Sequence, residues 1–459
     1  MAIKAIKEDF VAYMMLNEKQ FIVSINQNLC KFFAREEHDD MKVFYGKPIE
    51  QQFIYGFDED RYQIAFPIQQ SNPSPEYLFA FGQIYHPFKI PYIIKGNNST
   101  DDADKLDTFD AIAFTEKVID CLYPPGFTAV DLAGWPDSKS ISFRPSEEYT
   151  YNYPIELFGE KSKVVCSVNF SGSDLINGSL GKLSAIIRVE FERSQSISEF
   201  ERYYVLIKNF VAFCVGQHNI RFDSVEFKRR LTEGDHAGKF QTLGICKVFD
   251  EYEDYIEPKY HDVISIRAFD NHIINAINLL ADKKANPLLQ FLSNSNTGKR
   301  RVTYEDIKNL CTALEFEYSK SKFKNKGKNI QGLKKAIRRA IDEYCEASGT
   351  SDELKTQALN AFKWLNRSTA EKISILRDKI KGIIPSDDAE AFEISDQGIR
   401  EFVKMRNDIT HGNLIASWGN TGESYSKLCR IAYLCILLRM GLPEEKINSI
   451  FVHSIRRMF

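Results

Sequence analysis

The chain lacks the motifs by which several large enzyme classes are recognised. It has no glycine-rich phosphate loop, no G-x-G-x-x-G segment after a strand, and neither the H-E-x-x-H pattern of zinc proteases nor the G-x-S-x-G pattern of serine hydrolases. Its nine cysteines include no C-x-x-C pair, and its histidines show no metal-ligand spacing. These absences argue against the common nucleotide-dependent enzymes and hydrolases, and we predict neither a metal nor a cofactor.

Strong charge and long apolar runs are also missing. The formal net charge of −3 at pH 7 excludes a uniformly basic nucleic-acid-binding protein, although an even total can conceal opposed local patches. The longest nearly apolar stretch, residues 431–440, contains Arg439 and is shorter than the roughly 20 residues of a membrane span. The start carries a charge every few residues, unlike a signal peptide. We therefore expect a cytoplasmic protein with reduced thiols and no membrane partner.

Length and composition instead favour at least two well-packed domains. A chain of 459 residues exceeds the size at which one hydrophobic core keeps growing, and its 34 Phe and 21 Tyr supply large side chains for several cores. The hydrophobic period changes along the chain from that of strands to that of helices. We predict an α+β protein, with a β-rich antiparallel sandwich or barrel over residues 1–260 and an all-helical bundle over 261–459.

Strands in the first region are predicted from short runs that alternate in polarity or are rich in aromatic and β-branched residues. In the clearest run, Ile187, Val189 and Phe191 face one way while the charged residues between them face the other. The predicted strands cover residues 42–45, 52–57, 62–67, 77–84, 138–143, 164–170 and 183–192.

One helix is expected to pack on this β-rich domain. Ser198 and Glu201 have the spacing of a capping box, apolar residues recur every three to four positions after them, and Gly216 can end the helix in a left-handed turn. Residues 219–227 alternate again and should return to the sheet.

From residue 270 the pattern is helical nearly to the end. The predicted helices cover residues 271–284, 304–322, 332–346, 351–366, 370–384, 396–410, 423–440 and 444–457. The run 431–438 is hydrophobic nearly all round, so it lies either at the centre of the bundle or in a contact between subunits.

The most specific chemical pattern is R-N-D-I-T-H, from Arg406 to His411, at the end of a helix with Ser395 as its N-cap and Gly412 as its stop. Arg406 is in line with the apolar stripe of this helix, and a buried arginine needs an anionic partner. Cleavage of a phosphodiester by the ribose 2′-hydroxyl needs a group that moves protons and a fixed cation for the charge that grows on the phosphoryl oxygens. His411 and Arg406 supply one of each.

Spacing alone does not make this assignment. An Arg-x4-His pattern is expected by chance in roughly one chain of this composition in three, and Arg267 and His272 also fit it. We assign that second match to chance, because Asp270 is expected to cap the following helix and thus to separate the two side chains. A competing interpretation makes Arg406 part of a structural salt bridge and His411 an ordinary surface histidine.

The segment from Arg406 to His411 resembles the Arg-x4–6-His motif of HEPN ribonucleases in its frequent Arg-Asn form. Its place on a late helix of an all-α domain, after a β-rich region, is similar to the ApeA-like branch of bacterial anti-phage defence proteins. The upstream segment A-L-E-F-E, which ends at Glu317, is similar too. The resemblance covers residues from about 270 to 459 and, before them, rests on overall layout alone.

The resemblance implies a metal-independent ribonuclease in which two protomers line one composite cleft and cutting leaves a cyclic phosphate. It implies that His411 transfers protons, that Arg406 stabilises the phosphate and that Asn407 orients or contacts the substrate. Asp408 and Glu315 are further candidates for the polar, substrate-binding part of the cleft.

A basic segment predicts where RNA would bind. Between Lys299 and Arg339 the chain has nine Lys and four Arg against four acidic residues, a local charge of 13 − 4 = +9. Such runs are also common in loops that are simply solvated. The densest part contains the substrate-binding candidates Lys322, Lys324, Lys326 and Lys328.

We therefore expect an endoribonuclease of anti-phage (abortive infection) defence that cleaves RNA, forms a homodimer or higher homo-oligomer and responds to a phage-derived trigger through its β-rich region. The alternative is a non-catalytic adaptor whose HEPN-like bundle only dimerises or binds a partner.

Overall fold

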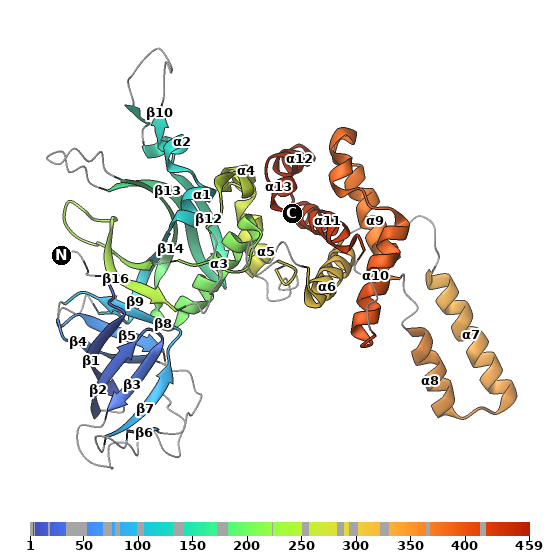
Figure 1. The fold of residues 1–459 in the computed structure, drawn as a ribbon, viewed down its shortest axis with the longest axis horizontal. Helices are drawn as coiled ribbons and strands as arrows, with labels where there is room; N and C mark the ends of the chain where they lie inside the picture. The colour runs from blue at the N-terminus through green and yellow to red at the C-terminus, as the bar shows by residue number, and fades with distance from the viewer. Residues whose placement is uncertain are drawn as a thin grey trace. The chain divides into compact units, whose positions relative to one another are not determined.

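The computed structural model describes residues 3, 5–16, 19–33, 53–67, 76–78, 83–98, 105–131, 142–144, 146–171, 182–222, 224–249, 257–281, 289–292, 302–321, 330–363, 368–413 and 419–459. The α+β class is confirmed: a large antiparallel sheet occupies the first part of the chain and helices occupy the last part (Figure 1). The chain divides into two compact units, formed mainly by residues 1–285 and 299–457.

The division between the units falls later than the predicted boundary at residue 260. Helices α4 (Ile266–Phe269) and α5 (Ile273–Ala281) belong to the first unit. The reason is packing: α5 lies against α3 (Phe200–Val215) and β12 (Tyr151–Leu157), and the Phe269 ring contacts Phe210 of α3 at 5.8 Å between centroids.

The first unit is built on one 14-stranded sheet whose pairs are all antiparallel within the described residues. The order across it is β12-β13-β14-β9-β15-β16-β8-β5-β4-β1-β2-β3-β7-β6. Besides β12, the strands are β1 (Asp9–Leu16), β2 (Lys19–Asn26), β3 (Leu29–Phe33), β4 (Phe53–Asp58), β5 (Gln63–Pro67), β6 (Glu76–Leu78), β7 (Gln83–Lys89), β8 (Tyr92–Gly96), β9 (Thr108–Thr115), β13 (Glu160–Ser171), β14 (Lys182–Ser196), β15 (Ser224–Arg230) and β16 (Phe240–Val248).

Short elements complete the first unit. β10 (Val130–Asp131) and β11 (Ser142–Phe143) pair separately, and α1 (Lys117–Leu122) and α2 (Pro125–Ala129) pack on β14.

Side chains from one face of the first strands form a core rich in phenylalanine. The buried Phe32 ring meets Phe21, Phe66 and Phe88 edge-on, with centroids 5.9, 6.4 and 5.5 Å away. Such edge-to-face contacts add to the stabilisation from apolar burial. The aromatic content noted in the sequence is thus used in the interior of the sheet unit.

Four predicted strands match observed ones, and others differ. Residues 52–57, 62–67, 164–170 and 183–192 correspond to β4, β5, β13 and β14, and residues 219–227 lead into β15. The prediction over 77–84 meets the separate strands β6 and β7, and that over 138–143 meets only β11 at its end. The predicted strand 42–45 lies outside the described residues. Seven described strands of the large sheet, β1, β2, β3, β8, β9, β12 and β16, were not predicted, and neither was the short β10.

Helix α3 covers the sheet as expected, but it begins differently. Gly216 ends it with a φ of 72°, the left-handed conformation predicted for that residue. The predicted capping box of Ser198 and Glu201 does not form. A 3₁₀ turn at Ile197–Glu199 precedes the helix instead, and the Ser196 hydroxyl accepts the Ser198 N–H there.

The second unit is a helical bundle. α6 (Tyr304–Lys320), α9 (Thr369–Lys381), α10 (Asp396–Thr410) and α11 (Thr421–Arg439) pack on one another, and α12 (Glu444–Ile450) packs on α11. α7 (Ile330–Ser348) and α8 (Asp352–Lys363) pack on each other as a pair (Figure 1). A 3₁₀ helix at Ser386–Phe392, a π turn at Phe451–Ile455 and α13 (Arg456–Met458) complete the unit.

The apolar run in α11 lies at the centre of this bundle. Residues 431–437 are all buried, although one chain alone is present. α11 contacts α6, α9, α10 and α12, so neighbouring helices cover all of its sides. The structure therefore supports the interpretation that this run lies at the centre of the bundle, and not the one that places it in a contact between subunits.

Candidate active site around Arg406

Helix α10 is fixed at its start by a side-chain cap and along one face by apolar burial. The Ser395 hydroxyl accepts the Gly398 N–H at 3.0 Å, as its N-cap role requires. Ile399, Phe402 and Val403 are buried against α6 and α9, which holds the helix in a fixed rotation. Because Arg406 continues this buried stripe, its side chain is directed at the neighbouring helices.

The end of α10 is a Schellman motif that fixes the backbone of His411. The Gly412 N–H donates to the Ile409 carbonyl at 3.1 Å, and the Asn413 N–H donates to the Asp408 carbonyl at 2.9 Å. Gly412 has a φ of 72°, so the stop predicted from its identity is observed. His411 is the C-cap residue, and its side chain is exposed.

The Arg406 guanidinium is held between α6 and α9. Its Nη2 donates to Glu315 Oε2 of α6 at 3.2 Å and to Thr369 Oγ1 of α9 at 3.3 Å. The Arg406 side chain is 22% exposed and that of Glu315 is 29% exposed, so the pair lies at the edge of the bundle. The anionic partner that a half-buried arginine requires is therefore Glu315.

Glu315 is the hub of this cluster. Its Oε1 accepts a 2.6 Å hydrogen bond from Thr369 Oγ1 and a 2.9 Å bond from Lys372 Nζ, while Oε2 receives Arg406. Burial by itself would raise the pKa of the Glu315 carboxyl, but the hydrogen bonds from Thr369 and Lys372 and the charges of Lys372 and Arg406 outweigh it and lower that pKa. The carboxylate stays charged and keeps two cations at the site.

The other edge of the guanidinium faces the helix end. Arg406 Nη1 donates to Asn407 Oδ1 at 3.1 Å, and Asn407 is exposed. The His411 N–H donates to the Asn407 carbonyl at 3.0 Å, so Asn407 joins the arginine to the turn that carries the histidine. Five helical positions correspond to roughly 140° of rotation, so Arg406 and His411 do not share one face of α10.

A buried thiol lies beside Arg406 but is not a nucleophile. Burial raises the pKa of Cys311 to about 12, and the nearby Arg406 charge offsets this only in part. The thiol is therefore protonated at neutral pH.

The substrate-binding candidates have different surroundings in the structure. Asp408 accepts a 3.3 Å hydrogen bond from the Asn413 side chain, which ties it to the turn after α10. Both Glu315 oxygens bind donors of the chain itself. The candidates Lys322, Lys324, Lys326 and Lys328 lie outside the described residues. The described remainder of the basic segment includes Lys334, Lys335, Arg338 and Arg339 of α7.

Thr369 and Lys372 are the two members of the cluster that the sequence did not indicate. They are one turn apart on α9, so their side chains lie on the same face. A local signal was present, because Ser368 and Glu371 form a capping box that begins α9 at Thr369. That signal places the helix start but does not reveal which helix faces Arg406.

The second candidate Arg-x4-His pair does not form a similar site. Arg267 lies within the short helix α4, which ends at Asp270 with a positive φ of 50°, and His272 lies in the following 3₁₀ turn. The pair is thus separated by a break in the helix at Asp270.

No protein-family model, curated protein or solved structure matches the chain. Within the described ranges, none of the helices combines the length and the apolar character that crossing a membrane would require.

Proposed function

We propose that the chain is a metal-independent endoribonuclease of the HEPN type that acts in bacterial anti-phage defence. The observation that carries the proposal is the fixed guanidinium. Arg406 is anchored through Nη2 by Glu315 and Thr369, and its Nη1 edge is directed to the exposed Asn407, one turn before the exposed His411. A cation fixed in place and an exposed imidazole are the two kinds of group that this cleavage needs.

The proposed reaction is a transesterification followed by departure of the 5′-oxygen. The ribose 2′-oxygen attacks the adjacent phosphorus and loses its proton, the bond from phosphorus to the 5′-oxygen breaks, and that oxygen takes up a proton. The products are a 2′,3′-cyclic phosphate and a 5′-hydroxyl. His411 moves a proton in this scheme, and Arg406 stabilises the charge that develops on the nonbridging oxygens.

Two copies of the chain would make the site complete. Because Arg406 and His411 are separated by roughly 140° around α10, a single helix does not present both to one phosphate from the same face. In the HEPN family two protomers bring both motifs into one cleft, and we propose the same homodimeric arrangement here. The basic residues of α7 would then add sequence-independent attraction for the RNA backbone.

A non-catalytic adaptor is the second candidate, and one observation favours it. Arg406 is already paired with Glu315, as in a structural salt bridge, and no hydrogen bond of the His411 imidazole is found among the described residues. In that case the bundle would serve only to bind a partner or a second copy.

Matched variants separate the two candidates. The enzyme proposal predicts that purified protein cleaves a total RNA pool in the presence of a chelator, and that the new 3′ ends are cyclic phosphates. Arg406→Ala and His411→Ala should each abolish cleavage, and should abolish growth arrest in phage-infected cells. Arg400→Ala, on the exposed side of α10, and His453→Ala are the controls and should retain both activities. If the four variants behave alike and circular dichroism shows all of them folded, the enzyme proposal is wrong and the adaptor is favoured.

A further inference from the structure

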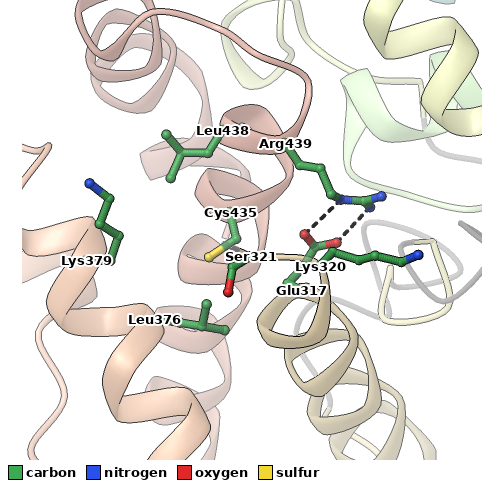
Figure 2. Close-up of a pocket in the computed structure, with 8 residues that line it drawn as sticks. All are labelled: Glu317, Lys320, Ser321, Leu376, Lys379, Cys435, Leu438 and Arg439. Carbon is green, nitrogen blue, oxygen red and sulfur yellow. Dashed lines mark hydrogen bonds and ion pairs between the residues drawn. The ribbon is translucent and has the colours of Figure 1, made fainter. Parts of the chain in front are cut away.

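A cavity of about 360 Å³ lies in the helical unit, away from the Arg406 cluster. It is formed where α6, α9 and α11 end, as Figure 2 shows. Lys379 follows Thr369 by ten residues on α9, which places the cavity roughly 15 Å along that helix from the cluster. The lining residues are Glu317, Lys320, Ser321, Leu376, Lys379, Cys435, Leu438 and Arg439.

The inner part of the cavity is apolar and uncharged. Leu376 and Cys435 are buried, and Leu438 stands beside them (Figure 2). Burial raises the pKa of the Cys435 thiol far above its ordinary value, with a smaller contribution from the charge of Glu317, so the sulfur is neutral. A ligand group placed here would meet hydrocarbon and sulfur, which favours an apolar body.

The outer part is positively charged. Glu317 is 2% exposed, and both its oxygens accept from Arg439, at 2.8 Å from Nη2 and 3.0 Å from Nε. This bidentate pair neutralises the single carboxylate of the lining. Lys320 and Lys379 are exposed, so the lining carries three cations against one anion, a net charge of 3 − 1 = +2.

Helix ends offset this charge only in part. The C-terminal carbonyls of helices attract cations, and three helices end here, each equivalent to roughly half a negative charge. At each end the chain itself supplies a donor: Ser321 N–H donates to Glu317 O at 2.9 Å, Gly382 N–H to Lys379 O at 3.1 Å, and Gly441 N–H to Leu438 O at 3.0 Å. The ammonium group of Lys379 forms no ion pair with any residue in the described part of the chain.

We propose that this cavity binds a small organic anion with an apolar body. The body would lie against Leu376, Cys435 and Leu438, and the negatively charged head would extend toward the ammonium group of Lys379. A cation would meet no uncompensated carboxylate in this lining, and a neutral apolar molecule would gain nothing from the two lysines. The volume is at the small end of the range for ligand sites, which suits a compact molecule and excludes an RNA strand.

Two fluorescent probes with the same ring system test the charge requirement. 8-Anilinonaphthalene-1-sulfonate carries a sulfonate, and N-phenyl-1-naphthylamine lacks it. In fluorescence titrations of the full chain, we expect the sulfonate probe to bind about tenfold more tightly. Lys379→Gln should remove that preference, while Lys381→Gln should keep it, because Lys381 is paired with Glu393 outside the cavity.

A second variant tests the location. Ser321→Phe places a ring in the lining of the cavity, at a partly exposed position, and it should weaken the binding of both probes at least tenfold. The proposal is overturned if the two probes bind equally to the wild type, or if the Lys379 and Lys381 variants give the same preference. Dye that binds elsewhere on the chain contributes equally to the two lysine variants, so it does not affect the comparison between them.

Discussion

The contact between Glu315 and Arg406 can be measured by a double-mutant cycle. We consider Glu315→Gln, Arg406→Met and the double variant, with the free energy of unfolding as the quantity compared. Each single change removes one charge of the pair. The coupling energy is the difference between the loss of unfolding free energy in the double variant and the sum of the losses in the two single variants.

The structure gives the size of this coupling. At the observed separation of 3.2 Å and an effective dielectric constant of about 20, the attraction between unit charges is about 5 kcal/mol. Removing both groups from water offsets most of this, since each is only about a quarter exposed. We expect a net coupling of about 1–2 kcal/mol. Glu315→Gln alone should cost about 2 kcal/mol, because it leaves Arg406 and Lys372 close together without their shared carboxylate.

The stability that Glu315 contributes should decrease as the pH falls. The pKa of Glu315 is lowered in the folded chain, from an ordinary value of 4.5, mainly because hydrogen bonds and nearby cations outweigh burial. The carboxylate therefore stabilises the fold above about pH 4.5, and this contribution is lost as the pH falls through the lowered pKa. Glutamine does not titrate. The difference in unfolding free energy between wild type and Glu315→Gln should therefore be largest near pH 7 and should shrink below pH 4.5.

Urea unfolding followed by circular dichroism at 222 nm is the appropriate assay, since this signal is dominated by the helical unit. Glu305→Gln is the control, because Glu305 is exposed in the first turn of α6. A coupling energy below about 0.5 kcal/mol, the value of an ordinary surface pair, would refute the anchoring role assigned to Glu315.

Two further predictions concern the same bundle. Arg439→Met should cost about 3–5 kcal/mol, because it leaves the buried Glu317 carboxylate unpaired. Burial already raises the pKa of Glu317, so this variant should regain stability as the pH falls from 7 to 5, and urea unfolding that shows no such gain would contradict the argument. Gly412→Ala should cost about 1–2 kcal/mol, because its φ of 72° strains any residue with a Cβ even where the added atom meets nothing within 4 Å. Thermal unfolding measures this, and an unchanged Tm would be the contrary result.

Helix α10 was predictable because its signals are local. Ser395 caps it, an apolar stripe gives it a period, and Gly412 stops it, and the observed bounds Asp396–Thr410 are those expected. The strand β1 was missed for an equally physical reason. Its buried residues alternate with Val11, Tyr13 and Met15, which are exposed but apolar, so hydropathy does not alternate where burial does.

Strand β9 was missed for the opposite reason. Six of its eight positions, residues 109–114, are buried, and a short run that is covered on both faces shows no period at all. Both strands are specified by their pairing partners, which no local pattern contains. The same limit applied to the site, where the sequence indicated Arg406 and Glu315 but not Thr369 and Lys372.

The contacts of Arg406 change the role that is assigned to Glu315. A carboxylate in contact with the substrate would repel a phosphate. A carboxylate that binds the inner edge of the arginine instead fixes the position of the guanidinium. Arginine can serve both purposes at once, because its planar fork has two edges. In this chain one edge is bound by Glu315 and Thr369, and the other edge reaches Asn407 at the surface. If the chain cleaves RNA, the phosphate should therefore compete with Asn407 for that outer edge and leave the Glu315 contact intact.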